Sequence, residues 1–348
     1  MKVICFLSTW YGPSGRFRFL QYEEEFAKKG YKMNYTAIYP MRHYSPAYPS
    51  NLINKIIARL IEPIRVLSVL YNGLRLPFYD AVILNKDLSP TVRIMWMEKY
   101  FLFFNKNIYL DLDDAIFLSS GRQRDKKFKI FFPELKGIIV SNRYLKEYAI
   151  SYNGNIKVIP MGIDLRTYTP KRVVSETKKL VIGWSGSDRS YDVTFPTIIP
   201  MLEKLGEKYP IEVLLIKNSN PHLKIKNVNV RFCPWSKETE VQSIKAMDIG
   251  LMPLIDDEFQ RYKSALKALQ YMAVGIPALV SPVGINSSIV DDGINGFHCA
   301  TEQDWLDNIE KLILNRELIG TMGKAARLKV EEEHALSVLI EEYVSIIK

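Results

Sequence analysis

The stretch 248–297 reads DIGLMPLIDDEFQRYKSALKALQYMAVGIPALVSPVGINSSIVDDGINGF, and the fold class is inferred from it. An apolar strand at 249–253 leads into a charged loop, and a helix follows whose apolar residues recur at helical spacing. A Gly-Ile-Pro break at 275–277 ends this helix before a second buried strand at 278–281. A strand, a helix and a second strand in this order predict half of a parallel α/β sheet.

Three polar side chains, Lys263, Lys267 and Gln270, lie in the loop and the helix of this stretch. Parallel sheets bind ligands beyond the carboxyl ends of their strands, so these side chains are expected beside a ligand. The pattern K-x-x-x-K-x-L-Q-Y-M-A-x-G-x-P at 263–277 resembles the nucleotide-sugar-binding segment of family 4 (group 1) glycosyltransferases, which are retaining enzymes of the GT-B fold. The resemblance continues through SPVGIN and DGINGF.

This resemblance implies an α/β protein of GT-B architecture, with two Rossmann-like βαβ domains that face each other across a cleft. It also implies transfer of a sugar, of the hexosyl type, from a nucleotide-diphosphate sugar to a glycan or lipid-linked acceptor. The anomeric configuration is then retained, and no obligatory metal or other cofactor takes part. Cell-surface polysaccharide or glycolipid synthesis is the expected role.

The length of 348 residues suits two domains better than a single core. Residues that break helices and strands place the boundary near 164–171, where V-I-P-x-G-I-D resembles the interdomain linker of the same family. We therefore expect an N-terminal acceptor-binding domain at 1–165 and a C-terminal donor-binding domain at 172–334. The resemblance implies that the last helix, 335–348, packs back on the first domain.

The net charge of +9 is unevenly divided along the chain. Residues 1–170 hold 25 Lys and Arg against 14 Asp and Glu, which gives +11, whereas the remainder holds 22 against 24, which gives −2. This asymmetry indicates an anionic partner of the first half, either a phosphorylated acceptor, an anionic membrane surface or nucleic acid. Simple solubility is the other interpretation. We expect no nucleic acid, because the cations are scattered and no nucleic-acid-binding module is recognised.

Three widely spaced cysteines predict neither a disulfide framework nor a zinc site, and they are typical of a reducing compartment. The first residues read as a buried strand rather than a secretory signal. No stretch reaches the roughly 20 apolar residues that a membrane-spanning helix needs. The sequence therefore predicts a cytoplasmic protein, which in one interpretation rests peripherally on the inner face of the membrane.

The first loop carries Gly12, Gly15, Arg16 and Arg18 between a strand and a helix expected at about 16–29. Glycines allow close approach of the backbone, and a helix amino terminus favours a phosphate, to which both arginines add charge. A tight turn before a helix explains the same pattern. Through the resemblance, Gly15 and Arg16 are expected to meet the donor.

A second basic feature is the helical stretch 51–78. Its apolar face comprises Ile53, Ile56, Ile57, Leu60, Ile61 and Ile64. Two interpretations are open, either a helix lying on an anionic bilayer or a helix packed with this face on the sheet.

The carboxylates Asp111, Asp113 and Asp114 end a predicted strand. A D-x-D pair chelates a divalent ion in glycosyltransferases of the other fold, GT-A. In a GT-B chain the cluster could instead hydrogen-bond the sugar or acceptor, or have a structural role. We expect no metal and assign Asp113 a catalytic role.

The second half restarts with a strand, the small residues Ser185, Gly186 and Ser187, and a helix, which predicts another anion-binding turn. Related enzymes commonly carry an Arg and a Lys there to bind the donor diphosphate. Arg189 is the only cation in this loop, so it serves alone or Lys263 supplies the second charge.

Related enzymes also carry two glutamates in an E-x7-E motif, and this chain lacks both. Gln270 stands at the second position and Tyr262 at the first. Gln270 can still hydrogen-bond a ribose diol, and Glu258 is near enough in sequence to reach the sugar. The missing acids also favour an alternative function, that of a non-catalytic homologue that only binds the sugar nucleotide. A basic nucleic-acid-binding protein is the other, less favoured alternative.

The predicted site therefore has two sets of residues and no metal ligands. The catalytic set is Asp113, Lys263 and Arg189. The donor-binding set is Gly15, Arg16, Ser185, Gly186, Ser187, Lys267, Gln270 and Glu258.

Overall fold

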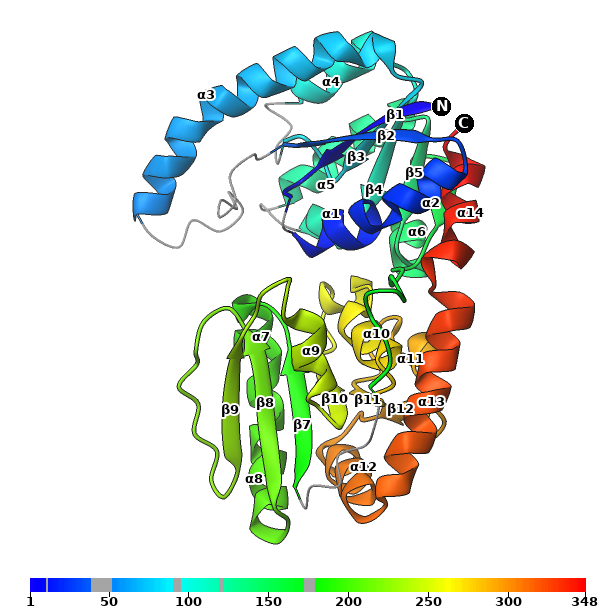
Figure 1. The fold of residues 1–348 in the computed structure, drawn as a ribbon. Helices are drawn as coiled ribbons and strands as arrows, with labels where there is room; N and C mark the ends of the chain where they lie inside the picture. Colours follow the sequence, from blue (N-terminus) through cyan, green and yellow to red (C-terminus); the bar gives the residue numbers. More distant parts are fainter. Residues whose placement is uncertain (11, 39–51, 90–94, 119–121, 172–178) are drawn as a thin grey trace. The chain divides into compact units, whose positions relative to one another are not determined.

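The computed structural model describes residues 1–10, 12–38, 52–89, 95–118, 122–171 and 179–348, with residues 52–61 described by their backbone. The chain divides into two compact units. Unit 1 comprises 1–162 and 336–348, and unit 2 comprises 163–335 (Figure 1).

Unit 1 is built on a six-stranded parallel sheet among its described residues, with the order β2-β1-β3-β4-β5-β6. The strands are β1 (Lys2–Leu7), β2 (Lys32–Ala37), β3 (Ala81–Asn85), β4 (Ile108–Leu112), β5 (Gly137–Val140) and β6 (Ile156–Val158). The helices are α1 (Pro13–Arg18), α2 (Glu23–Lys28), α3 (Leu52–Arg75), α4 (Trp96–Phe104), α5 (Gln123–Phe131), α6 (Arg143–Ala149) and the C-terminal α14 (Leu336–Ile346). Strands β1, β3, β4 and β5 are almost wholly buried, as expected for a parallel sheet covered on both faces.

The C-terminal helix α14 completes the core of unit 1. Tyr343 is fully buried, and its ring packs edge-on against Phe19, Tyr22 and Phe26 at centroid distances of 5.6, 5.1 and 5.7 Å. Figure 1 shows α14 beside α2, although the two helices lie at opposite ends of the chain. Aromatic pairs in this geometry contribute beyond the area they bury, so the last helix is an integral part of this unit.

Unit 2 has its own six-stranded parallel sheet, with the order β12-β11-β10-β7-β8-β9 in the described part of the chain. The strands are β7 (Leu180–Ser185), β8 (Ile211–Lys217), β9 (Asn229–Pro234), β10 (Ile249–Met252), β11 (Ala278–Val280) and β12 (Gly296–His298). The helices are α7 (Asp188–Thr194), α8 (Ile199–Lys208), α9 (Glu240–Lys245), α10 (Leu266–Ala273), α11 (Asn286–Ile289), α12 (Glu302–Leu314) and α13 (Arg316–Glu333). Numbered within the unit, the order is 6-5-4-1-2-3, that of a dinucleotide-type Rossmann sheet.

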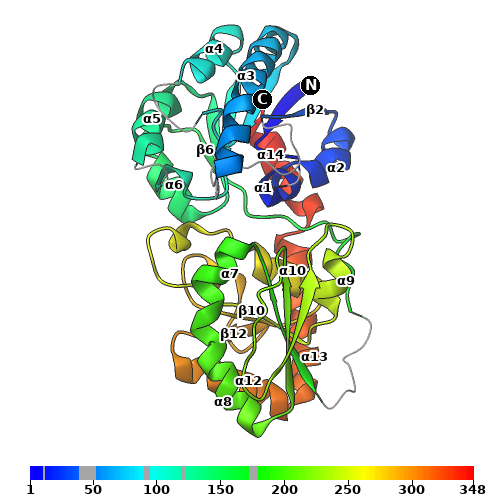
Figure 2. The ribbon, with the colours of Figure 1, turned by 90° about the vertical axis from the view of Figure 1, so that its left-hand side faces the viewer.

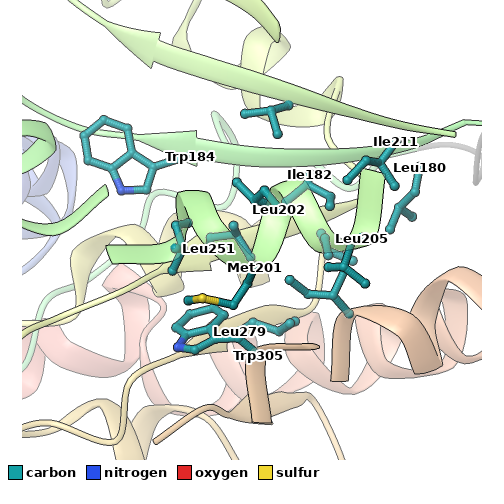
Figure 3. Packing of buried hydrophobic residues seen from close by; sticks show 14 of the residues in the cluster. Leu180, Ile182, Trp184, Met201, Leu202, Leu205, Ile211, Leu251, Leu279 and Trp305 are labelled. Carbon is teal, nitrogen blue, oxygen red and sulfur yellow. The ribbon is translucent and has the colours of Figure 1, made fainter. Parts of the chain in front are cut away.

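The core of unit 2 lies between this sheet and the helices that cover it. Figure 3 shows Met201, Leu202 and Leu205 of α8 packed onto apolar side chains of the central strands, with Trp184 at one end of the cluster. Trp184 is fully buried at the carboxyl end of β7, so the core continues up to the edge where strands give way to loops.

The predicted α/β class with two βα units is confirmed. Helix α6 is capped by Asn142, whose side-chain oxygen accepts a hydrogen bond from the Leu145 N–H at 3.0 Å. The helix predicted at 16–29 is interrupted, because Phe19 has φ −137° and ψ −51° and separates α1 from the turn before α2. In the part of the chain that the structure describes, no helix has the length and apolar character needed to cross a membrane.

The helix predicted within 51–78 is present as α3. Most of its predicted apolar face, 53–61, lies outside the described side chains. Ile64 is described, and it is 55% exposed rather than buried. At this position the interpretation in which the apolar face packs on the sheet is wrong, and the other interpretation stays open.

Candidate functional site

The topology of unit 2 locates a ligand site between two loops. Strands β7 and β10 are hydrogen-bonded neighbours, and the strand order reverses between them. In open α/β sheets, ligands bind beyond the carboxyl ends of the strands at such a switch point. The loop after β7 begins at Gly186, and the loop after β10 ends at Ala265, so the candidate site lies between them.

The loop after β7 is held by hydrogen bonds to α10, β8 and α7. The Ser185 N–H donates to the Tyr271 hydroxyl at 2.9 Å, and the Gly186 N–H donates to the Ile216 carbonyl at 3.0 Å. Ser187 caps α7, because its hydroxyl accepts the Ser190 N–H at 3.2 Å. The loop predicted at 185–187 is therefore positioned before any ligand arrives.

Tyr271, which holds this loop, lies on helix α10, the helix that follows β10. Its ring lies against Gly250, where a Cβ would be 2.2 Å from the ring. Glycine is required here because any side chain would displace the ring whose hydroxyl accepts the Ser185 N–H.

Lys267 reaches across the switch point from the first turn of α10. Its Nζ donates to the Ser190 hydroxyl at 2.8 Å and lies 4.1 Å from the centroid of the Trp184 ring. A Cβ on Gly186 would lie 2.6 Å from this Nζ, so the ammonium lies directly against the backbone of the β7 loop. The lysine predicted as donor-binding is therefore brought to the predicted small-residue turn.

The electrostatics of this lysine favour an anion. Burial and then the positive charge of Lys263 hold the pKa of the Lys267 ammonium well below its ordinary value. The eight-residue helix α10 begins after Ala265, which makes no side-chain capping hydrogen bond to its first amide groups. Two cations and a helix amino terminus at one place form a site that a phosphate would stabilise.

A further lysine, which sequence reasoning missed, fixes the start of α7. Lys217 at the end of β8 is buried and pairs with Asp188 at 2.8 Å, and its Nζ lies 4.5 Å from the Tyr191 ring centroid. Asp188 also accepts hydrogen bonds from the N–H and the hydroxyl of Ser219. The available signal was Lys217 itself, a charged residue that follows four consecutive apolar residues at the end of the strand.

The other predicted residues of unit 2 lie around this position. Arg189 is an exposed residue of the first turn of α7, and its guanidinium carbon is 5.9 Å from the ring centroid of Phe259 in the β10 loop. Glu258 is an exposed neighbour of Phe259 in the same loop. Lys263 ends a short turn, with its N–H donating to the Gln260 carbonyl at 3.2 Å.

Gln270 is buried, and its amide belongs to a chain of hydrogen bonds. Its Nε2 donates to the Tyr168 hydroxyl at 2.7 Å, and Tyr168 donates its single hydroxyl proton to Glu240 at 2.7 Å. The Trp235 indole donates to the other oxygen of Glu240, also at 2.7 Å. Because Tyr168 can only accept from residue 270, an amide fits this place and a carboxylate does not.

We predict that Gln270→Glu lowers the free energy of unfolding by about 1–3 kcal/mol at neutral pH, since a buried carboxylate would face a hydroxyl with no proton to donate. Gln303→Glu is the control, because the Gln303 amide also donates a side-chain hydrogen bond, here to Asp307, but is exposed. Denaturant unfolding of both variants measures the difference. Equal, small losses would show that the Tyr168 hydroxyl reorients without cost.

Gly15, Arg16 and Asp113 belong to unit 1. A Cβ at Gly15 would lie 3.2 Å from the Thr9 carbonyl, which explains the glycine by close packing. The Arg16 guanidinium carbon lies 4.4 Å from the Phe17 ring centroid. Asp113 is nearly buried after β4, with Oδ1 3.4 Å from the Lys86 ammonium.

The position of Arg18 in the sequence suggested that it adds positive charge to the first loop. In the structure it does not. It is fully buried and pairs with Asp111, with Nη2 2.6 Å and Nε 2.9 Å from Oδ1. Its Nη1 donates to the carbonyls of Ile159 and Pro160, and Asn85 donates to the other oxygen of Asp111. The ion pair joins α1 to β4, and the Nη1 hydrogen bonds join α1 to the segment after β6. Asp111 therefore has a structural role.

Among the described residues, no group of three or more His, Cys, Asp or Glu side chains is arranged to hold a metal ion. The positive charge at the candidate site comes from the side-chain ammonium groups of Lys263 and Lys267, and Lys263 is close enough to lower the pKa of Lys267.

Comparisons with known proteins agree with this architecture. Residues 195–315 match the family model described as "Glycosyl transferases group 1", whereas no curated protein sequence matches the chain. A glycosyltransferase from Rickettsia africae ESF-5 aligns with a TM-score of 0.69 at 14% identity, covering 100% of this chain and 98% of that one.

Two further solved structures align over nearly their whole length. Sucrose-phosphate synthase from Thermosynechococcus elongatus gives a TM-score of 0.69 at 14% identity, covering 99% of this chain and 98% of that one. HepE from Anabaena, in complex with UDP and glucose, gives 0.66 at 13% identity and covers 99% of each chain. The predicted GT-B fold and the resemblance to group 1 glycosyltransferases are thereby confirmed.

Proposed function

We propose that this chain, which carries the group 1 glycosyltransferase segment in unit 2, is a retaining glycosyltransferase that uses a nucleotide-diphosphate sugar. The observation that carries the proposal is the position of Lys267 at the β7–β10 switch point, against Gly186 and close enough to Lys263 to have its pKa depressed. In such a reaction the bond between the anomeric carbon and the diphosphate breaks, and negative charge develops on the diphosphate. Preorganised cations stabilise that charge.

The roles follow from the positions of the side chains. Lys267 and Lys263 bind the diphosphate with the first amides of α10, and Arg189 approaches it from α7. The backbone at 185–187 supports the phosphates. Gln270 and Glu258 are proposed to contact the ribose and the sugar.

For unit 1 we propose acceptor binding, with Asp113 assisting the reaction and Gly15 and Arg16 contributing to donor contacts. The lysines provide the charge that a divalent ion supplies elsewhere, so we propose that no metal is required. UDP-sugars are the first donors to test, since HepE from Anabaena was solved with UDP. A glycan or lipid-linked acceptor, and a role in polysaccharide or glycolipid synthesis in the cytoplasm, complete the proposal.

The test is donor turnover followed by proton NMR with a set of UDP-, GDP-, ADP- and dTDP-sugars, with water as the acceptor where no other is known. We expect release of nucleotide diphosphate from at least one donor, with the anomeric configuration of the donor in the first product. An inverted product would contradict retention. Release that requires added Mg²⁺ or Mn²⁺ would contradict metal independence.

A second candidate function is binding of the sugar nucleotide without transfer. It is favoured by the hydrogen bond of Gln270 to Tyr168, which leaves an amide where related enzymes have a glutamate. Tight donor binding with no turnover for any donor would support this candidate.

Donor binding is expected to depend on pH through Lys267. Its pKa is lowered in the free protein by burial and by Lys263, and a bound diphosphate raises this pKa again. Binding therefore takes up a proton, and affinity falls as the pH rises through the lowered pKa of the free protein. Calorimetry in buffers of different ionisation enthalpy measures this uptake; affinity that is constant from pH 6 to pH 9, with no proton uptake, would contradict it.

A further inference from the structure

The apolar face that includes Ile64 continues along helix α3, and the described residues of unit 1 leave it exposed. Ile64, Leu67, Tyr71 and Leu74 are 55%, 66%, 63% and 60% exposed. Their spacing of three, four and three residues places them on one side of the helix. The buried positions Arg65, Val69 and Asn72 lie on the opposite side, so these four residues, called the outer stripe below, point away from the core.

The apolar surface extends beyond the outer stripe. Phe78, just after α3, is 77% exposed. Helix α4 lies beside α3, with the Tyr100 hydroxyl donating to the Leu70 carbonyl at 3.0 Å, and the two helices are seen side by side in Figures 1 and 2. On α4, Phe103 is 77% exposed. Large apolar side chains gathered in this way mark an interaction surface.

Cations lie at the C-terminal end of the outer stripe. Lys2, Lys32 and Arg75 line one pocket together with Phe78 and Tyr79. None of these three cations forms an ion pair with a carboxylate among the described residues. The acidic side chain at this edge is Asp80, which accepts the backbone N–H of Lys2 at 2.6 Å.

Arg75 joins the pocket to the stripe. Its guanidinium carbon lies 5.6 Å from the Tyr71 ring centroid and 5.9 Å from that of Tyr79. Its nitrogens donate to the Asn72 side chain and to the Tyr79 hydroxyl, both at 3.0 Å. The guanidinium is thus held between the apolar stripe and the cationic pocket by neutral partners, and its charge is left to a ligand.

We propose that the outer stripe docks on the surface of a bilayer that contains anionic phospholipids. The apolar side chains enter the boundary between headgroups and acyl chains, and Lys2, Lys32 and Arg75 bind the lipid phosphates. A second copy of the chain fits this surface less well, because a two-fold interface sets the same patch against itself, and this patch offers its three cations only Asp80 among the described residues. This proposal does not depend on the transferase function.

The experiment is cosedimentation of the full chain with vesicles of phosphatidylcholine containing 30% phosphatidylglycerol, and with vesicles of phosphatidylcholine alone, in 0.1 M salt. We expect the bound fraction to be roughly tenfold higher on the anionic vesicles and to fall in 0.5 M salt. Leu67→Glu/Leu74→Glu should lower binding to anionic vesicles roughly tenfold, since two charges would enter the apolar layer.

The control is Leu314→Glu/Leu328→Glu, which changes two leucines of unit 2 that are 69% and 52% exposed. It should bind vesicles as the wild type does. Lys2→Ser/Lys32→Ser tests the cations separately and keeps the proposal testable if the glutamate variant unfolds. Wild-type protein that stays in the supernatant with anionic vesicles overturns the proposal. So does a dimer by light scattering that Leu67→Glu/Leu74→Glu dissociates.

Discussion

Replacing Lys267 by methionine is expected to lower kcat/KM for donor turnover by about 10²–10³-fold, the loss typical of removing one preorganised charge-stabilising group. Methionine keeps the apolar length that packs on Trp184 but removes the ammonium. The bond from Nζ to Ser190 is lost as well, yet Ser187 still caps α7. The fold should therefore survive, and initial rates of nucleotide diphosphate release provide the measurement.

Lys204→Met is the matched control. Lys204 lies on α8 in the same unit, 58% exposed, with its nearest carboxylate 3.9 Å away. Its replacement should leave kcat/KM within about twofold of wild type, because an exposed charge away from the switch point contributes little. If both variants lose activity equally, the role assigned to Lys267 is wrong.

The second large effect concerns stability rather than chemistry. Arg18→Met is expected to lower the free energy of unfolding of unit 1 by about 3–5 kcal/mol, since it leaves the Asp111 carboxylate buried without its partner. The carbonyls of Ile159 and Pro160 lose their donor at the same time. Chemical denaturation followed by circular dichroism measures the loss.

An exposed pair serves as the control for this prediction. Lys28 pairs with Glu25 at 2.7 Å in the same unit, with its side chain 62% exposed, so Lys28→Met should cost no more than about 1 kcal/mol. The double variant Arg18→Met/Asp111→Leu should recover part of the stability, because no isolated charge is then buried. A loss below about 1 kcal/mol for Arg18→Met would contradict the account of the buried pair.

The fold could be predicted because the signals for it are local. Strands of near-continuous apolar residues, small-residue turns and amphipathic helices follow one another in a fixed order, and that order suffices for two parallel sheets. Lys267 and Gly186 could also be predicted, since Gly186 directly follows β7 and Lys267 lies in the first turn of the helix after β10. The contact between these two residues could not be predicted in the same way. It requires β7 and β10 to be neighbours in the sheet, and this depends on the strand order.

Other parts of the site depend on partners far apart in the chain. Arg18 follows a glycine-bearing loop, which suggested a phosphate ligand, but its partner Asp111 is 93 residues away. The amide of Gln270 is matched to Tyr168, 102 residues away, and the sequence shows only that a glutamate is missing. Helix α3 illustrates a third limit, because helical periodicity identifies an apolar face but not which of two faces is buried.

Unit 2 is proposed to bind a nucleotide diphosphate through Lys263 and Lys267. Calorimetric titration of UDP, GDP, ADP and dTDP against the matching monophosphates tests it most directly. We predict that one diphosphate binds at least about tenfold more tightly than its monophosphate, a difference of about 1.4 kcal/mol, and that Lys263→Met/Lys267→Met abolishes this difference. Equal affinity for the two nucleotides, or a preference that the double variant retains, would contradict the claim.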